Sequence, residues 1–153
     1  MYTHSDLIQD MIKDVRVPRF VKVKQCFNSP VIRDIQAELH LELSRIDFKS
    51  MIKPGMNIAI TAGSRGIANI ALIIREVCTI LKQYGANPFI VPAMGSHGGA
   101  TAQGQQALIE SYGITEEYCG APIVSSMEVK LIAHTETNKP VYIDKNAAES
   151  DGI

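Results

Sequence analysis

The sequence predicts an α/β fold, in which helices flank a parallel or mixed sheet, because two short apolar runs are each followed by a glycine-rich loop and the start of a helix. The apolar runs are residues 57–61 and 89–91, and a long amphipathic segment separates them. This succession of strand, helix and strand is typical of the crossover between two parallel strands. We expect one domain over residues 1–153, with a less regular lead-in over residues 1–50.

The lead-in is predicted to hold two helices and one strand. Ser5 is a suitable N-cap for a short helix that ends near Lys13, and residues 34–43 have a second helical pattern. Residues 19–26 alternate apolar and polar side chains weakly and are predicted to form a strand. The Lys-Pro-Gly sequence at residues 53–55 predicts a turn that leads into the first apolar run.

The segment that begins at Ile67 is the clearest helix of the sequence, and Gly85 stands where its C-terminal cap is expected. Its apolar residues recur at helical spacing and are Ile70, Ala71, Ile74, Val77, Cys78 and Leu81. Asn87-Pro88 is expected to break the chain before the second apolar run, and Thr101 to begin a helix that Gly113 ends. With a helix after each strand, we expect a Rossmann-like arrangement.

The pattern weakens beyond Gly120. Short strands are predicted over residues 123–126, 128–134 and 141–144. A helix is predicted to begin within residues 145–150, and residues 151–153 are predicted to form a turn that enters another strand.

The composition supports one apolar core and speaks against two classes of partner. Apolar residues make up 46% of the chain, and the formal net charge is -1 without any tryptophan, so a broad nucleic-acid surface is not expected. No run reaches the roughly 18 apolar residues that a membrane helix needs, and the start of the chain lacks the features of a signal peptide. We therefore expect a cytoplasmic protein without a membrane partner, and a homo-oligomer is left open.

Two loops carry the candidate chemistry: the first loop (residues 61–66, Thr-Ala-Gly-Ser-Arg-Gly) and the second loop (residues 92–101, Pro-Ala-Met-Gly-Ser-His-Gly-Gly-Ala-Thr). If the two strands are parallel neighbours, both loops leave the carboxyl edge, where open α/β sheets bind ligands. Arg65 has a planar cationic head suited to a carboxylate or a phosphate. His97 can exchange a proton near neutral pH. The pair is typical of an anion anchor beside a general acid or base.

The remaining candidate positions offer hydroxyl or backbone donors to an anionic small molecule. They are Gly63, Ser64, Ser96, Gly98, Gly99 and Thr101. The glycines indicate that something approaches the backbone closely, and the helix that follows each loop is expected to aim free N–H groups at the same crevice. Simpler alternatives stay open, in which Arg65 pairs with a surface carboxylate and His97 caps a helix or bonds within its own loop.

The sequence gives no support for a metal site or for a nucleotide fingerprint. His4, His40 and His134 have no ligand spacing, and the three cysteines include no Cys-x-x-Cys pair. The loops match neither the P-loop nor the dinucleotide motif. The rival functions are therefore a non-catalytic module that binds a small anion and, less favoured, an ordinary nucleotide-dependent oxidoreductase domain.

The loop sequences nevertheless resemble a known family. Gly-Ser-Arg-Gly-Ile-Ala-Asn at residues 63–69 and Pro-Ala-Met-Gly-Ser-His-Gly-Gly-Ala-Thr-Ala-Gln-Gly-Gln at residues 92–105 are similar to the amino-terminal domain of the lactate racemase-like family, and more narrowly to its branch of nickel-pincer-cofactor-dependent isomerases. The similarity runs from about residue 19 to the end and includes the sequences at residues 113–117 and 121–127. The motif of the second loop is long and quite specific.

The resemblance implies a racemase or epimerase of a 2-hydroxy acid that passes a hydride reversibly to a nickel-pincer nucleotide. In that reading His97 matches the first of two histidines that shuttle the hydroxyl proton. Arg65 matches the arginine that contacts the anionic substrate, and Ser64 matches a threonine beside that arginine. The cofactor would supply the hydride acceptor that the two loops lack.

Two departures from the family pattern qualify these expectations. Lactate racemases carry an acidic residue where this chain has Ala62 and a proline where it has Gly66, so lactate is not the expected substrate. The second histidine, the lysine that tethers the cofactor and the nickel-ligating histidine would lie beyond Ile153, in a carboxy-terminal domain. We therefore expect a truncated domain that binds neither metal nor cofactor by itself and is inactive alone.

Overall fold

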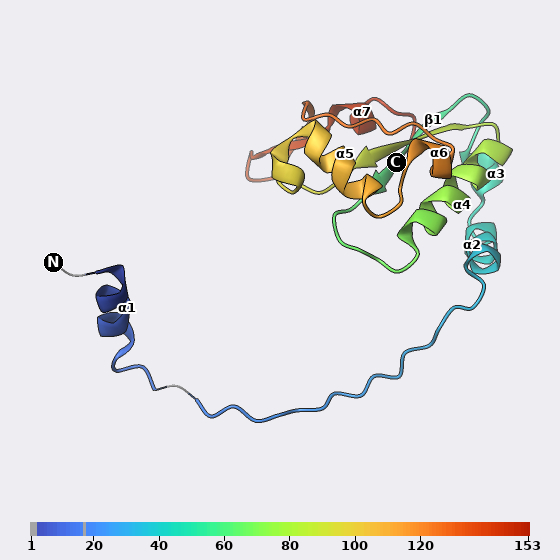
Figure 1. Cartoon of the computed structure of the whole chain (residues 1–153). Coiled ribbons are helices and arrows are strands. Elements are labelled where there is room, and N and C mark those ends of the chain that lie inside the picture. Colours follow the sequence, from blue (N-terminus) through green and yellow to red (C-terminus); the bar gives the residue numbers. More distant parts are fainter. Residues whose placement is uncertain (1–2, 17) are drawn as a thin grey trace. The chain divides into compact units, whose positions relative to one another are not determined.

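The computed structural model describes residues 3–16 and 18–153 and divides the chain into two units, Met1–Val31 and Ile32–Ile153 (Figure 1). Within the described ranges no helix combines the length and the apolar character needed to cross a membrane. The strands that the structure describes lie in the second unit, together with both glycine-rich loops. The candidate site therefore belongs to the second unit.

The first unit contains helix α1 (His4–Ile12), whose cap differs from the expected one. The prediction of Ser5 as N-cap is wrong, because Thr3 caps the helix. Thr3 Oγ1 accepts a hydrogen bond from the Asp6 N–H at 3.2 Å, and the Asp6 carboxylate accepts one from the Thr3 N–H at 2.8 Å. This reciprocal box needs a polar acceptor three residues after the cap, and Ser5 has Ile8 there.

The predicted strand over residues 19–26 is wrong. Residues 18–31 form neither helix nor strand, and their side chains are exposed. A strand is stabilised by ladder hydrogen bonds and by contacts across to a partner strand. In the described part of the chain this segment has no such partner. Alternation of residues such as Val21 and Lys22 is therefore not sufficient to form a strand.

The second unit contains both helices and strands (Figure 1). The helices are α2 (Ile35–Ser44), α3 (Phe48–Met51), α4 (Ile70–Gln83), α5 (Ala102–Glu110), α6 (Glu116–Cys119) and α7 (Lys145–Ala148), with a short 3₁₀ turn η1 (Gly98–Ala100) before α5. The strands are β1 (Asn57–Ala62), β2 (Asn87–Pro92), β3 (Val129–His134) and β4 (Pro140–Asp144). The predictions of α2, α4 and α5 are confirmed. The sequence did not indicate α6, since a single turn leaves no periodic pattern.

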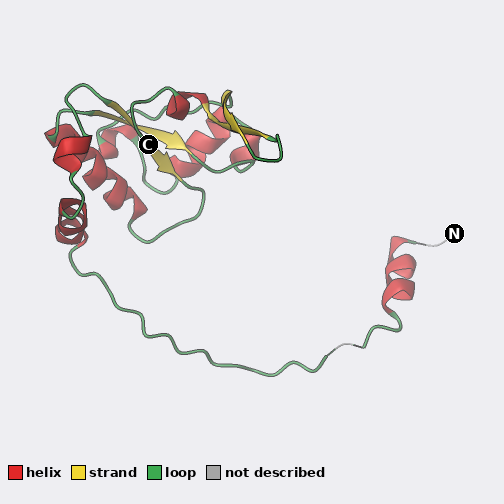
Figure 2. Cartoon of the chain, turned by 180° about the vertical axis from the view of Figure 1, so that it is seen from behind, coloured by secondary structure: helices red, strands yellow, loops and turns green. Residues whose placement is uncertain are grey.

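β1 and β2 are parallel neighbours, as the sequence predicts. Two further segments flank them through single parallel bridges, Gly152 beside Ile58 and Ile123 beside Ile90. β3 and β4 form a separate antiparallel hairpin (Figure 2). The fold is thus a mixed α/β fold with one parallel and one antiparallel pair. The strand predicted over residues 123–126 is reduced to the bridge at Ile123.

Side chains alternate between the two faces of β1 and β2, and each face has its own apolar cluster. The first cluster lies against α4, α5 and α6 and includes Ala62, Ile74, Ile90, Ile109 and Cys119. On the opposite face Ala59 and Val91 pack with Ala147 of α7. Helices therefore cover both faces of the parallel pair, and the cluster beneath α7 is the smaller one.

The expectation that Asn87-Pro88 breaks the chain is wrong, because both residues lie in β2. The Asn87 N–H donates toward β1, to Met56 O at 2.7 Å, whereas the Ile90 N–H donates to Pro122 O on the other side. Pro88 has the same parity as Ile90, so the N–H that it lacks would point away from β1. The proline therefore removes no hydrogen bond from the β1–β2 ladder.

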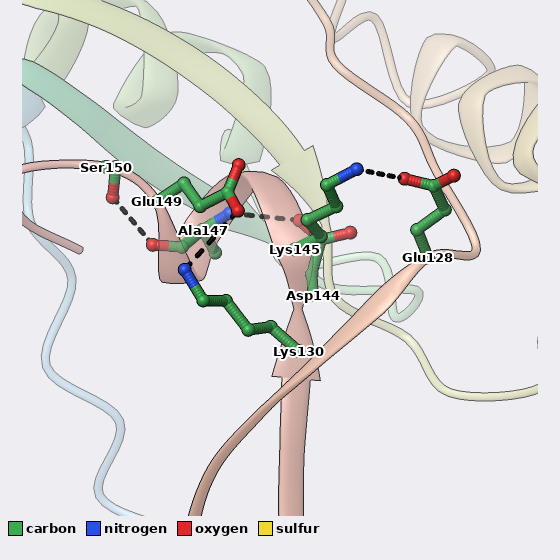
Figure 3. A network of polar contacts seen from close by, with 7 residues as sticks. All are labelled: Glu128, Lys130, Asp144, Lys145, Ala147, Glu149 and Ser150. Carbon is green, nitrogen blue, oxygen red and sulfur yellow. Dashed lines mark hydrogen bonds and ion pairs between the residues drawn. The ribbon is translucent and has the colours of Figure 1, made fainter.

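Two ion pairs connect the hairpin region to α7 (Figure 3). Lys130 Nζ lies 3.3 Å from Glu149 Oε1, and Lys145 Nζ lies 2.7 Å from Glu128 Oε2. Asp144, at the end of β4, caps the first turn of α7 with its carboxylate. The four paired side chains are exposed, so each ion pair contributes little to the stability of the fold.

Glu76 on α4 is a buried carboxylate that links neighbouring helices. Arg75 Nη2 and Nε donate to Glu76 Oε1 at 2.8 and 3.0 Å. Hydrogen bonds from Arg75 and then from Gln36 of α2 hold the pKa of the Glu76 carboxyl below its ordinary value. The Arg75 guanidinium also lies 4.9 Å from the ring centre of Tyr118 in α6. The Glu76 cluster thus joins α4 to both α2 and α6.

Ile90 is fully buried at the centre of the larger cluster, and its backbone pairs on both sides. We expect Ile90→Ala to lower the free energy of unfolding by about 2–5 kcal/mol, because the change removes buried methyl groups and leaves a cavity. The matched control, Ile132→Ala at an exposed position of β3, should change it by less than about 0.5 kcal/mol. Urea denaturation measures both, and equal losses would contradict the assigned core.

The pKa of Glu76 is lower in the folded than in the unfolded chain, so its carboxylate stabilises the fold above the unfolded-state value of about 4.3. That contribution is lost as the pH falls through the lower, folded-state pKa. We expect Glu76→Gln to be less stable at pH 7 and to lose less stability than the wild type between about pH 5 and about pH 3. Urea denaturation across this pH range measures the slopes. The control Glu117→Gln, at an exposed carboxylate, should keep the wild-type dependence of the unfolding free energy on pH. If the pH profile of Glu76→Gln ran parallel to that of the wild type, the lowered pKa of Glu76 would be refuted.

Candidate functional site

The parallel pairing of β1 and β2 brings the two glycine-rich loops to one edge. Ala62 lies opposite Pro92 at the ends of the strands. Immediately beyond, the Ala93 N–H donates to Ala62 O at 2.8 Å, so the second loop leaves the sheet beside the first. The expectation that both loops start at the same edge is confirmed. In open α/β sheets this carboxyl edge is where ligands bind.

A hydrogen bond between side chains joins the two loops. His97 Nδ1 lies 2.5 Å from Ser64 Oγ, although 33 positions separate the residues in the chain. His97 is exposed and Ser64 is half-buried. The contact forms because the strands place the two loops next to each other, and it connects two residues that the sequence nominated separately.

This contact determines which nitrogen of His97 can serve a ligand. The Ser64 hydroxyl engages Nδ1, so Nε2 is the ring nitrogen left to exchange a proton. A serine hydroxyl both donates and accepts, and it can therefore accept from a protonated Nδ1. In that arrangement the neutral ring has a lone pair on Nε2 and can act as a base there.

Arg65 follows Ser64 directly and is exposed. Within residues 3–16 and 18–153 it takes part in no ion pair, so this range offers no surface carboxylate for the simpler interpretation of this arginine. Ser96 is exposed and directly precedes His97. Arg65 is therefore the next residue in the chain after the one that contacts His97.

The glycines of the two loops have different surroundings. A Cβ on Gly98, at φ +64°, would lie 2.6 Å from the backbone of Gly104 and Gln105, so the chain's own helix α5 makes the close approach there. That finding corrects the expectation of a ligand against Gly98. At Gly63 and at Gly99 nothing lies within 4 Å of the added Cβ, and these two positions are open. Gly99 also adopts φ +68°, a conformation that favours glycine.

The helices after the loops differ at their first turns. Thr101 Oγ1 accepts from the Gly104 N–H at 3.1 Å and donates to Gly98 O at 3.2 Å, so its single proton is committed to its own loop. α4 starts at Ile70 rather than at Ile67, after Asn69 at φ +62°, and Asn69 provides no side-chain cap. The expectation of free N–H groups thus fits the start of α4 better than the start of α5.

Sequence reasoning missed two residues that support the contact. Gln105 of α5 is 4% exposed, and its Nε2 donates to Gly95 O at 2.7 Å and to His97 O at 3.3 Å. Tyr112, just after α5, donates from its hydroxyl to Ser64 O at 2.6 Å. One signal for Gln105 was present, because it precedes the buried Ile109 by four positions and so shares the apolar face of the helix.

An apolar pocket of about 500 Å³ opens at the same edge. Residues 93–95 of the second loop line it, together with Gln105, Tyr142 of the hairpin and Ala147 of α7. Ser64, Arg65 and His97 are not part of its lining. The polar contact and the apolar pocket are therefore neighbours that share the backbone around Gly95.

The described residues suit proton exchange and anion binding rather than metal ligation. In residues 3–16 and 18–153 no group of three or more His, Cys, Asp or Glu side chains could hold a metal ion. Burial raises the pKa of Cys78 to about 11, which disfavours its thiolate as a ligand.

Comparisons of the chain with protein-family models, with curated proteins and with solved structures found no match.

Gly98 and Gly66 provide a matched pair for testing the loop geometry. We expect Gly98→Ala to lower the free energy of unfolding by at least about 2 kcal/mol, because the backbone is left-handed there and α5 blocks the Cβ. Gly66→Ala meets open space and should change stability by less than about 0.5 kcal/mol. Urea denaturation measures both variants, and similar small effects would show that α5 is not packed against the second loop.

Proposed function

We propose that this chain is the amino-terminal part of a racemase or epimerase of a 2-hydroxy acid, similar to the nickel-pincer-dependent branch of the lactate racemase-like family. The observation that carries the proposal is the hydrogen bond between His97 of the second loop and Ser64 of the first. It brings together two residues that the family resemblance assigns to one site. Within the proposal the parallel pair β1–β2 belongs to a Rossmann-like sheet, and the protein is cytoplasmic.

His97 is the proton-exchanging group of the proposed site. Its Nε2 would accept the proton of the substrate hydroxyl on one half of the reaction and return it on the other. In the proposal Ser64 accepts from Nδ1–H in both states, since the neutral ring and the imidazolium can each carry a proton there. The serine therefore keeps the ring in the same orientation while Nε2 changes its protonation.

Arg65 is the proposed grip for the substrate carboxylate. Its guanidinium offers parallel donors that match the two oxygens of a carboxylate. Because Arg65 is adjacent to Ser64, a carboxylate held there would lie close to the histidine that acts on the neighbouring hydroxyl. A 2-hydroxy acid carries these two groups on adjacent carbons, which fits two functions placed side by side.

The proposed reaction also needs a hydride acceptor, which the nickel-pincer nucleotide supplies when bound. In the family that the chain resembles, the tether, the nickel ligand and the second proton-shuttling histidine belong to a carboxy-terminal domain, and the proposal follows that assignment. The contribution of this chain is to orient the substrate and to move a proton at His97 Nε2.

The alternative is a module that binds a small carboxylate or phosphate without chemistry. It is favoured by the fact that the His97–Ser64 contact also has a structural use, since it ties one loop to the other. In that case Arg65 alone would carry the function, and the protonation of His97 would have no part in it.

Replacement of His97 by Asn in the complete protein, supplied with its cofactor, separates the two functions. We expect turnover of the accepted 2-hydroxy acid to fall by about 10²- to 10⁴-fold, because proton transfer is lost while the carboxylate grip remains. Chiral chromatography of a panel of 2-hydroxy acids measures turnover, and calorimetry measures the Kd. The control is Glu117→Gln, at an exposed position of α6 outside the candidate site, with an expected change below about threefold. Unchanged turnover in His97→Asn would remove the histidine from the mechanism, and carboxylate binding without any wild-type turnover would support the alternative.

A further inference from the structure

We infer that Gln105 and Tyr112 are positioning residues, which together hold the His97 ring against Ser64. This inference rests on the proposed proton-exchanging role of His97. Both belong to α5 or to the turn that follows it. Neither is part of the loops that carry the candidate site. Each nevertheless holds the backbone of one partner of the contact.

Gln105 holds the loop that carries His97. Its amide nitrogen donates to Gly95 O at 2.7 Å and to His97 O at 3.3 Å, and so connects the carbonyl groups of two residues in the segment 95–97. The side chain is 4% exposed, which makes water a poor substitute for these acceptors. A buried amide that satisfies two loop carbonyls restricts the direction in which the His97 side chain leaves the backbone.

Tyr112 holds the loop that carries Ser64. Its half-buried hydroxyl donates to Ser64 O at 2.6 Å across 48 positions of the chain. The bond is made to the backbone of Ser64, so the serine hydroxyl remains available for His97. Tyr112 therefore places the serine without competing for its side chain.

The two anchors share one rigid support. Gln105 lies in the first half of α5 and Tyr112 lies in the turn after its end, where the Tyr112 N–H donates to Ile109 O at 3.0 Å. The close backbone approach of Gly98 to Gly104 holds the second loop against the same helix. Because both loops are attached to α5, the distance between Ser64 and His97 depends on the helix and not on two independent loops.

Nuclear magnetic resonance of the whole chain tests the inference directly. At a pH where His97 is largely neutral, the ¹⁵N shifts of its ring report which nitrogen carries the proton and whether Nδ1 is hydrogen-bonded. We expect Gln105→Met and Tyr112→Phe each to change the ratio of the two neutral tautomers by about fivefold, the equivalent of one lost hydrogen bond. The controls are Gln106→Met on the same helix and Tyr118→Phe on α6, which should leave the His97 signals unchanged.

A purely structural role for these two residues predicts a different pattern. If Tyr112 acts by positioning Ser64, then Tyr112→Phe should have no further effect on the His97 ring in a Ser64→Ala background. The reason is that Ser64→Ala has already removed the hydrogen bond between Ser64 and His97. A general loosening of the fold would add its effect in both backgrounds. Additive changes, or unchanged His97 signals in two folded variants, would overturn the inference. If Gln105→Met fails to fold, Tyr112→Phe decides alone, because it removes only one hydroxyl.

Kinetics of the complete, cofactor-loaded protein separate this inference from the proposed function. Misplacement of the imidazole should lower kcat by about 10-fold or more in Tyr112→Phe, with KM within about twofold, because the carboxylate grip is untouched. If the wild type has no turnover while the ring signals respond as expected, the proposed function fails and the positioning roles stand. If turnover depends on His97 and is unchanged in both positioning variants, the inference is overturned and the function stands.

Discussion

The parallel register of β1 and β2 is the constraint on which the candidate site depends. Because Ala62 and Pro92 end their strands opposite one another, the loops that follow must start at the same edge. A slip of either strand by one residue would turn its isoleucine, Ile60 of β1 or Ile90 of β2, from the larger apolar cluster to the opposite face, so burial of these side chains fixes the register. The Ser64–His97 contact is thus a consequence of how the isoleucines pack, although neither residue belongs to the core.

The elements that could be predicted are those whose signal is local. The apolar spacing along α4, the Thr101 cap of α5 and the apolar runs of β1 and β2 each reside in a few consecutive residues. Failures occurred where the outcome depends on a distant partner or on backbone geometry. Pro88 is tolerated in β2 because its missing N–H would point away from β1. Residues 19–26 alternate like a strand but have no partner strand among the described residues.

The candidate site shows the same division. Residue type and loop context were sufficient to nominate Ser64, Arg65 and His97, but not to show that Ser64 touches the histidine ring. The glycines were interpreted as positions where a ligand approaches the backbone. At Gly98 the backbone of α5 makes this close approach instead. A glycine in the sequence can indicate that another group approaches its backbone closely, but it does not indicate which group that is. Gln105 and Tyr112 were missed because their partners are carbonyl groups, which every residue has.

The bridge between Ile58 and Gly152 has a consequence for synthesis on the ribosome. β1, α4 and β2 follow one another in the chain and can associate while later codons are still being translated. The outer neighbour of β1, however, is made 94 positions after Asn57, whose N–H donates to the Asp151 carboxylate. Until residues 151 and 152 emerge from the exit tunnel, the outer edge of β1 has no hydrogen-bonding partner. Contacts between residues so distant in the sequence also form slowly. The N–H and C=O groups on that side of β1 therefore stay available to other strands until residues 151 and 152 have been synthesised.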